Sequence, residues 1–192
     1  MSLTRMKERR SGAQSNSLAG QLLLAHPALR DPNFRRAVIL LSVHNPDGAM
    51  GVVLNRPLDK QLGELNADFA AGPLAGVPLY FGGPVSPEQL IIVSWQWLAL
   101  ENAFQLHFGL DPENAAAQVG TPGLTFRAFL GYSGWSTRQL ENELKHDTWL
   151  PQVVEGGELE KKDGTALWRS LVSAMAPELK LLANEPDDPA MN

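Results

Sequence analysis

The sequence predicts an α+β fold rather than a doubly wound parallel sheet. Three observations support this prediction: segments with strand character outnumber helical ones, hairpin turns are mixed with helices, and the helical patterns come mostly late in the chain. The 192 residues, 44% of them apolar, are enough for one domain with a substantial core.

A hairpin is predicted between residues 37 and 55. Ala37–Val43 is a continuous apolar, β-branched run, which is typical of a strand buried on both faces. Asn45-Pro46-Asp47-Gly48 has residues favoured at the first, second and fourth positions of a type I turn. Gly51–Asn55 then returns as the second strand.

Six further segments are rich in the apolar and aromatic residues that strands favour, and turn residues bound them. We predict strands at Gln21–Ala25, Val77–Phe81, Leu90–Ser94, Phe104–Phe108, Leu124–Gly131 and Trp149–Val154. A turn is expected at Asp31–Phe34.

Helical spacing and capping residues predict four helices. Leu58, Leu62 and Leu65 indicate a short helix after Pro57, and Asp111-Pro112-Glu113 has the residues that start a helix. Ser136 and Gln139 have the spacing of a capping box. In the helix that would follow, Leu140 and Leu144 share one face. In the last helix, Ala166–Ala176, we expect four residues to point inward: Leu167, Leu171, Val172 and Met175.

Charge divides the chain unevenly. Residues 1–36 hold seven Lys and Arg against two acids, a net charge of +5. Because the whole chain carries −5, the remaining residues carry a net charge of −10. We expect residues 1–17 to be a disordered basic arm, residues 18–183 to be a single domain, and residues 184–192 to be an acidic flexible tail. The acidic body argues against a large DNA-binding face.

The absence of cysteine excludes disulfides, zinc–thiolate sites, iron–sulfur clusters and a thiol nucleophile. The apolar run near Leu22 is too short and too interrupted for a signal peptide, and no stretch has the roughly 18 apolar residues of a membrane-spanning helix. We therefore expect a cytoplasmic protein without a membrane segment.

The segment Gly131-Tyr132-Ser133-Gly134-Trp135 invites comparison with a hydrolase nucleophile, because we expect it to form a turn between a strand and a helix. The motif G-x-S-x-G requires glycine two residues after serine, where this chain has Trp135. The only histidine after Ser133 is His146, one or two turns along the helix that we expect to follow. The triad order Ser, then Asp or Glu, then His therefore fails as well. The sequence favours a turn made by Ser133 and Gly134, with Trp135 anchoring the next helix in the core.

Other polar positions are less specific. None of the four histidines stands in a metal-ligand motif, so neither a metal nor another cofactor is expected. Gly82-Gly83-Pro84 is too short for a phosphate loop and fits a tight turn, with a ligand-lining role as the alternative. Arg56 is suited to an anion or to a neighbouring carboxylate.

Four segments in combination and order resemble the YqgE/AlgH family of bacterial proteins. They are Gly20–Pro27 with Asp31–Phe34, His44–Pro57, Phe81–Val85, and Gly131–Trp135 with Gln139–Glu141. The resemblance implies an α+β fold with a bifurcated, mostly antiparallel sheet, part of it closed as a small barrel, surrounded by helices. It also implies a cytoplasmic protein, and it supplies no catalytic residues. One branch of the family is linked to transcriptional control of exopolysaccharide production. This chain departs from the family at Ser133, where alanine is common.

We expect a non-enzymatic binding or regulatory protein whose working surface combines three turn segments. The residues of this expected surface are His44, Asn45, Asn55, Arg56, Gly82, Gly83, Pro84, Tyr132, Ser133, Gly134, Trp135 and Gln139. The ligand would be a protein partner or a small anion. One alternative is an enzyme that holds an anionic metabolite with Arg56 and the amides near Ser136. Another is nucleic-acid binding by the basic arm.

Overall fold

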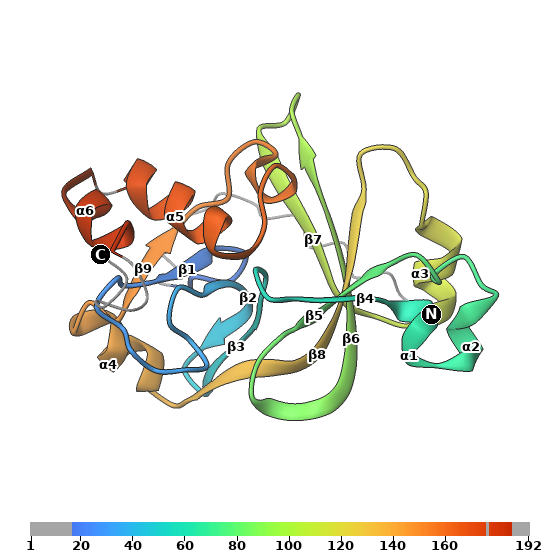
Figure 1. The fold of residues 1–192 in the computed structure, drawn as a ribbon, viewed down its shortest axis with the longest axis horizontal. Helices are drawn as coiled ribbons and strands as arrows, with labels where there is room; N and C mark the ends of the chain where they lie inside the picture. The colour runs from blue at the N-terminus through green and yellow to red at the C-terminus, as the bar shows by residue number, and fades with distance from the viewer. Residues whose placement is uncertain (1–16, 176, 186–192) are drawn as a thin grey trace.

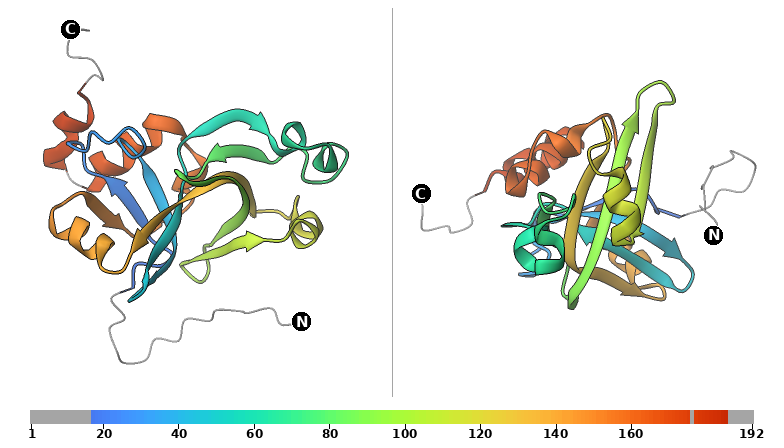
Figure 2. Two further views of the ribbon diagram at one scale, coloured as in Figure 1. Left: turned by 90° about the horizontal axis from the view of Figure 1, so that it is seen from below. Right: turned by 90° about the vertical axis from the view of Figure 1, so that its right-hand side faces the viewer.

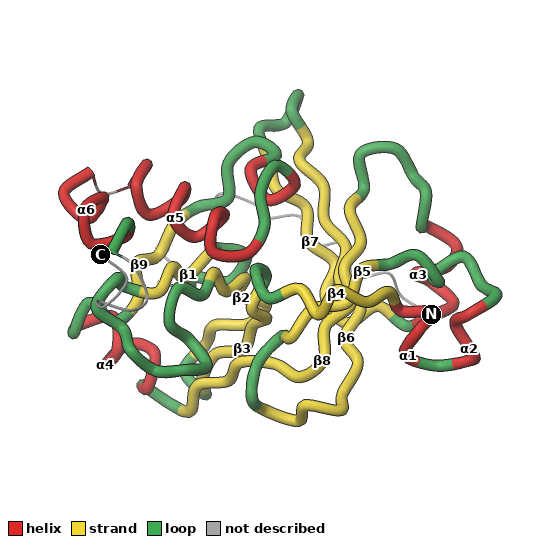
Figure 3. Tube along the Cα trace, viewed as in Figure 1, coloured by secondary structure: helices red, strands yellow, loops and turns green. Residues whose placement is uncertain are grey.

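The computed structural model describes residues 17–175 and 177–185 and confirms the α+β class. Its strands join into one branched sheet with helices packed around it (Figures 1 and 3). The strands are β1 Leu22–Ala25, β2 Val38–Asn45, β3 Gly48–Val53, β4 Pro57–Gln61, β5 Pro78–Phe81, β6 Val85–Leu98, β7 Ala103–Leu110, β8 Thr125–Ser136 and β9 Trp149–Gln152. The helices are α1 Leu62–Leu65, α2 Ala67–Ala70, α3 Pro112–Gln118, α4 Gln139–Lys145, α5 Gly164–Met175 and α6 Lys180–Ala183, with 3-10 turns at Glu158–Glu160 and Pro177–Leu179.

The sheet branches at β8, as the family resemblance implied. One path runs β4-β5-β8-β3-β2-β1-β9, and the β6–β7 pair leaves this path from β8. In the described part of the chain, β5 with β8 is the one parallel pair. The sheet curls into a half-barrel that helices surround (Figure 2).

The predicted hairpin is confirmed. β2 and β3 pair antiparallel, with Asn45 opposite Gly48 at the turn and a bulge after Leu41. The Asn45 Oδ1 atom accepts a hydrogen bond from the Asp47 amide at 2.9 Å, which closes the turn locally.

Three apolar clusters hold the sheet and helices together. Alternate residues of β1 face opposite sides, so Leu22 and Leu24 join one cluster while Leu23 and Ala25 join the next. α5 covers the first cluster, α4 covers the second through Leu140, and α1 and α3 cover the third. The helices therefore divide between two lobes joined by β8 (Figure 1).

The helix predicted from Leu58 to Leu65 is partly wrong. Pro57–Gln61 is strand β4, paired with β5, and Leu58 is 37% exposed. Helix begins only at Leu62, after a capping box between Gln61 and Glu64. The leucine spacing matched a helix, but pairing with β5 decided the conformation of the first half.

The turn predicted at Ser133 and Gly134 is also wrong, because β8 continues unbroken to Ser136. The helix cap differs as well: Arg138, in the left-handed region, precedes α4. Gln139 still bonds back, its Oε1 accepting from the Ser136 amide and hydroxyl. In α5, Met175 is 41% exposed rather than inward.

The predicted disordered arm, residues 1–17, and flexible tail, residues 184–192, lie almost wholly outside the described residues and stay predictions. Ser17 is described, and its hydroxyl donates to the His44 carbonyl at 2.8 Å. None of the described helices is both long and apolar enough to cross a lipid bilayer.

The branch point is a close crossing of two glycine-containing backbones. Just after β5, a Cβ at Gly82 would lie 2.2 Å from the Gly131 carbonyl oxygen, and one at Gly83 would lie 2.3 Å from the Tyr132 carbonyl. From the other side, a Cβ at Gly131 would lie 2.4 Å from the Gly83 oxygen. No side chain fits between these segments.

Gly82 links β8 to β3 at this crossing. Its amide donates to the Leu130 carbonyl at 2.8 Å, and its carbonyl accepts from the Val53 amide at 2.8 Å. β8 therefore exchanges its neighbour β5 for β3 at this point.

We expect Gly83→Ala to destabilise the fold by about 3 kcal/mol, because the new methyl group would collide with backbone that cannot move independently and Gly83 has a φ of +151°. Urea unfolding measures the loss. Gly76→Ala is the matched control: a Cβ there meets nothing within 4 Å, so stability should stay within about 1 kcal/mol of wild type. Equal stabilities of the two variants would contradict the crossing.

Candidate binding groove

The hairpin separates the residues that the sequence analysis placed on one surface. His44 and Asn45 lie at its turn, whereas Asn55 and Arg56 follow β3 at the opposite, open end. At a strand rise of about 3.4 Å per residue, the two pairs are roughly 20 Å apart. The hairpin therefore places the two pairs of residues at its two ends, and their sharing one working surface stays a prediction.

At the open end, Asn55 and Arg56 serve the fold. The Asn55 Oδ1 atom accepts from the Val38 amide, and its Nδ2 donates to the Arg36 and Gly164 carbonyls. Arg56 donates to the Pro32 and Arg35 carbonyls at 3.2 Å each. Burial, and then the positive charge of Arg35, lower the pKa of Arg56.

The glycine turn and the segment after Gly131 build the branch point. Gly82, Gly83 and Ser133 are buried, while Pro84 and Gly134 are exposed beside them. The Ser133 hydroxyl, 1% exposed, donates to the Gly82 carbonyl at 3.3 Å. The Ser133 hydroxyl is therefore a structural group of the branch point in this arrangement.

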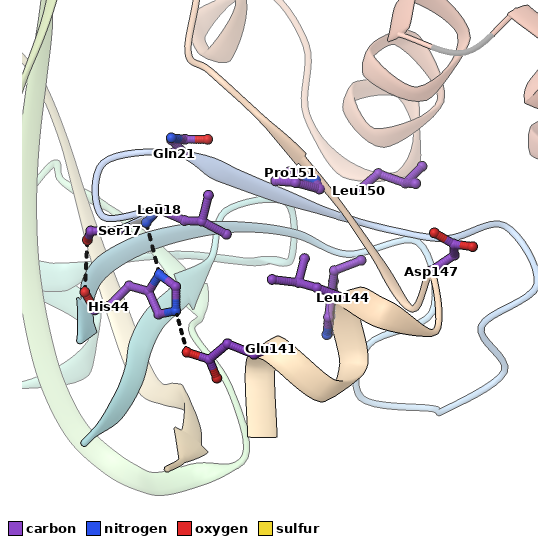
Figure 4. A pocket seen from close by; sticks show the side chains of 10 residues that line it. Ser17, Leu18, Gln21, His44, Glu141, Leu144, Asp147, Leu150 and Pro151 are labelled. Carbon is purple, nitrogen blue, oxygen red and sulfur yellow. Dashed lines mark hydrogen bonds and ion pairs between the residues drawn. The ribbon is translucent and has the colours of Figure 1, made fainter. Parts of the chain in front are cut away.

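A groove of about 530 Å³ lies at the turn end of the hairpin, where the segment from Ser17 to Gln21, α4 and β9 meet (Figure 4). Of the twelve residues expected at a binding surface, His44 alone lines it. The lining residues are Ser17, Leu18, Gln21, His44, Glu141, Leu144, Asp147, Trp149, Leu150 and Pro151.

His44 joins two walls of this groove. Its Nδ1 atom accepts from the Leu18 amide at 2.9 Å, so this nitrogen carries no proton in this arrangement. Its Nε2 atom lies 3.1 Å from Glu141 Oε1 and donates to it. The imidazole thus ties the segment before β1 to helix α4, and its side chain is only 7% exposed.

Glu143 holds the two tryptophans behind the groove. Its Oε2 atom accepts from the Trp135 indole at 2.8 Å and from the Trp149 indole at 2.7 Å, and its Oε1 accepts from Gln139 at 3.0 Å. The two indoles meet edge to face, 5.9 Å apart. Trp135 and Gln139 therefore support the groove through Trp149, which lines it.

The sequence analysis missed Glu143, Trp149 and Glu141 as residues of this site. Glu141 and Glu143 lie two apart on α4, so they face different directions, and each has its own partner. Two features of the sequence could have indicated this site. Gln139 and Glu143 lie one helical turn apart, and Trp135 and Trp149 stand on either side of the helix.

The groove has an apolar floor and an acidic rim. Leu18, Leu144, Leu150 and Pro151 supply apolar surface, and Glu141 and Asp147 supply carboxylates. A bond from its own backbone amide, and then the contacts with His44 and the charge of Lys145, lower the pKa of the Glu141 carboxyl. Glu141 is therefore ionised at neutral pH.

The groove offers surface for binding but few groups for chemistry. Within the described residues, no three His, Asp or Glu side chains gather in a way that could hold a metal ion. His44 uses both ring nitrogens, one with the Leu18 amide and the other with Glu141.

Comparison with known protein families gives a clear match. The model of a family described as AlgH-like matches residues 22–180. A UPF0301 protein of Streptomyces coelicolor is 38% identical, over 92% of this chain and 96% of its own length. A UPF0301 protein of Magnetococcus marinus is 35% identical, over 88% of this chain and 94% of its own.

Solved structures share the fold. The solution structure of AlgH from Pseudomonas aeruginosa aligns with a TM-score of 0.64 and 26% identity, covering 93% of this chain and 99% of that one. The crystal structure of DIP2367 from Corynebacterium diphtheriae aligns with a TM-score of 0.67 and 22% identity, covering 93% and 95%. At 22% identity the second match supports the fold alone.

We expect Glu143→Ala to lower the free energy of unfolding by about 2–4 kcal/mol, because two buried indole N–H groups would lose their acceptor. Glu143→Gln keeps an oxygen that can accept both bonds and should cost about 1 kcal/mol. Asn142→Ala, exposed on the same helix, is the control and should change stability by less than about 0.5 kcal/mol. Chemical denaturation measures all three, and equal losses for Ala and Gln would contradict the bonded arrangement.

Glu141 should make stability depend on acid pH. Because its pKa in the folded protein lies below the ordinary 4.5, its stabilising effect is fully present above pH 4.5 and is lost as pH falls through the folded pKa. We expect the stability difference between wild type and Glu141→Gln to shrink below pH 4.5 in denaturation curves. A difference that grows on acidification would contradict this assignment.

Proposed function

This chain belongs to the AlgH-like family, and we propose that it is a non-enzymatic binding protein that holds a protein partner in the groove between Ser17–Gln21, α4 and β9. The observation that carries the proposal is the His44 side chain. It bonds to two walls of the groove and holds them in fixed positions, while the surface between them stays open. Such a preformed recess suits recognition with little reorganisation.

The chemistry of the groove specifies the kind of partner. Leucine and proline side chains would contact apolar residues of an extended segment or helix turn. The Glu141 and Asp147 carboxylates would attract a lysine or arginine at the edge of that segment. A short basic–apolar stretch of a partner protein fits both features.

A regulatory role follows as part of this proposal. The family branch linked to transcriptional control would act, in this view, through a bound regulator and not through DNA. The excess of acidic residues beyond residue 36 supports that distinction, since a DNA-binding face needs basic residues. We propose the cytoplasm as the location, and the cysteine-free composition supports it.

The arrangement gives less support to the enzyme alternative. That alternative needs Arg56 and the amides near Ser136 to hold one anion. Arg56 follows β3 at its far end, whereas Ser136 pairs with Gly48 at its beginning. The Ser136 amide already donates to Gln139 at 3.0 Å, so it is not open to an anion.

A peptide library displayed on phage tests the proposed function. We expect wild-type protein to enrich peptides that combine apolar residues with Lys or Arg. Glu141→Lys should weaken binding of the enriched peptides about tenfold, equivalent to about 1.4 kcal/mol. The matched control Glu88→Lys reverses an exposed charge on β6, away from the groove, and should leave binding unchanged.

Two results would contradict the proposed function. One is enrichment of peptides whose binding is insensitive to Glu141→Lys. The other is a small metabolite that raises the melting temperature of wild type but not of Glu141→Lys, because that result would assign the groove to a small molecule.

A further inference from the structure

A second surface of this protein is the free edge of strand β7. Residues 103–110 pair with β6 on one side only. On the other side, none of their backbone groups has a hydrogen-bond partner in the part of the chain that the structure describes. The β6–β7 hairpin projects from the body of the molecule, which leaves this edge accessible (Figure 1).

The other two sheet edges carry features that prevent strand addition. β4 contains Pro57, Asp59 and Lys60, and its pairing with β5 is irregular between Pro57 and Lys60. β9 has four residues, one of them Pro151. Proline, charge, irregularity and shortness are the usual protections of an edge strand. β7 has eight residues with neither proline nor a charged side chain, and its pairing with β6 is regular from Ala103 to Phe108, with one irregularity at Gly109.

The sequence of β7 is complementary to itself. Phe104, Leu106, Phe108 and Leu110 alternate with Ala103, Gln105, His107 and Gly109. The first three pack against the core cluster that includes Trp95, but they stay half-buried because the sheet ends there. Another strand would complete their cover only if it placed apolar residues at alternate positions on the same face.

A second copy of β7 meets that requirement. In an antiparallel pairing centred on Leu106, Phe104 of one copy lies opposite Phe108 of the other, and Gln105 lies opposite His107. Apolar residues then share one face and polar residues the other. No Lys, Arg, Asp or Glu occurs within β7, so two copies of an acidic chain can approach there without charge repulsion along the strand.

We propose that two copies of this chain associate through antiparallel pairing of their β7 strands, forming a continuous sheet around a two-fold axis. The interface is isologous, since the same residues of β7 contribute from each side. The surface is separate from the groove, whose lining includes no residue of β6 or β7. Each dimer therefore presents two grooves to partners.

The mass of the full chain in solution tests this proposal. In sedimentation equilibrium we expect the weight-average mass to rise with concentration from 20.9 kDa toward twice that value. Gln105→Lys/His107→Lys places like charges opposite each other across the interface and should weaken the dimer at least about tenfold. Leu58→Lys, on the protected edge β4, is the control and should leave the dimer unchanged.

A second readout does not depend on how the charged variant folds. The chain has no cysteine, so Leu106→Cys and Leu58→Cys each contain a single thiol. With diamide as oxidant, two thiols lose two electrons and form one disulfide between copies. We expect Leu106→Cys to cross-link at least about tenfold faster than Leu58→Cys, because only the former strand is held against its copy.

Three outcomes would overturn the proposal. They are a wild-type mass that stays monomeric at every concentration, a dimer unaffected by the lysine pair, and equal cross-linking of the two cysteine variants. Phage peptides that still bind to a monomeric chain would leave the proposed function of the groove intact while removing the dimer.

Discussion

The fold depends on one close backbone crossing. Where β5 ends, Gly82 and Gly83 lie against Gly131 and Tyr132 at a separation that admits no Cβ atom. The crossing allows β8 to pair with β5 and β6 in its first half and with β3 in its second. Two lobes with separate clusters of apolar residues are thereby built on one strand. Glycine is required here by the distance between backbones, and the Ser133 hydroxyl adds a bond across the same point.

The position of the groove follows from this arrangement. Beyond the crossing, β8 runs beside β3 to Ser136 and delivers the chain to α4, whose polar side chains face β2 on one side and β9 on the other. Glu141 then reaches His44, and Glu143 reaches Trp135 and Trp149. Two carboxylates of one short helix, pointing in different directions, fix opposite parts of the same wall. Hydrogen bonds thus join the walls of the groove to the body of the fold, whereas β7 at the other branch is a sheet edge that we propose for association.

Local signals in the sequence were sufficient for the hairpin, since the turn residues Asn45–Gly48 act on their immediate neighbours. They were insufficient for Leu58, where pairing with a distant strand outweighed leucine spacing. The motif around Ser133 resembled a turn because glycine is common in turns, but Gly131 serves a close contact with Gly83, 48 positions earlier in the chain. The site was predicted only in part. His44 was identified, but its partners were not, because the directions of Glu141 and Glu143 depend on how α4 packs against the sheet.

Native-state hydrogen exchange of the Gly82 and Val53 amides tests the central claim most directly, because their bonds to Leu130 and Gly82 join the strands at the crossing. If the crossing holds both lobes together, these amides exchange only by global unfolding, and their exchange free energies equal the free energy of unfolding measured with denaturant. Exchange at a much lower free energy, with amides of β1 and β2 still protected, would show that the crossing opens locally and would contradict its role as the constraint on which the fold depends.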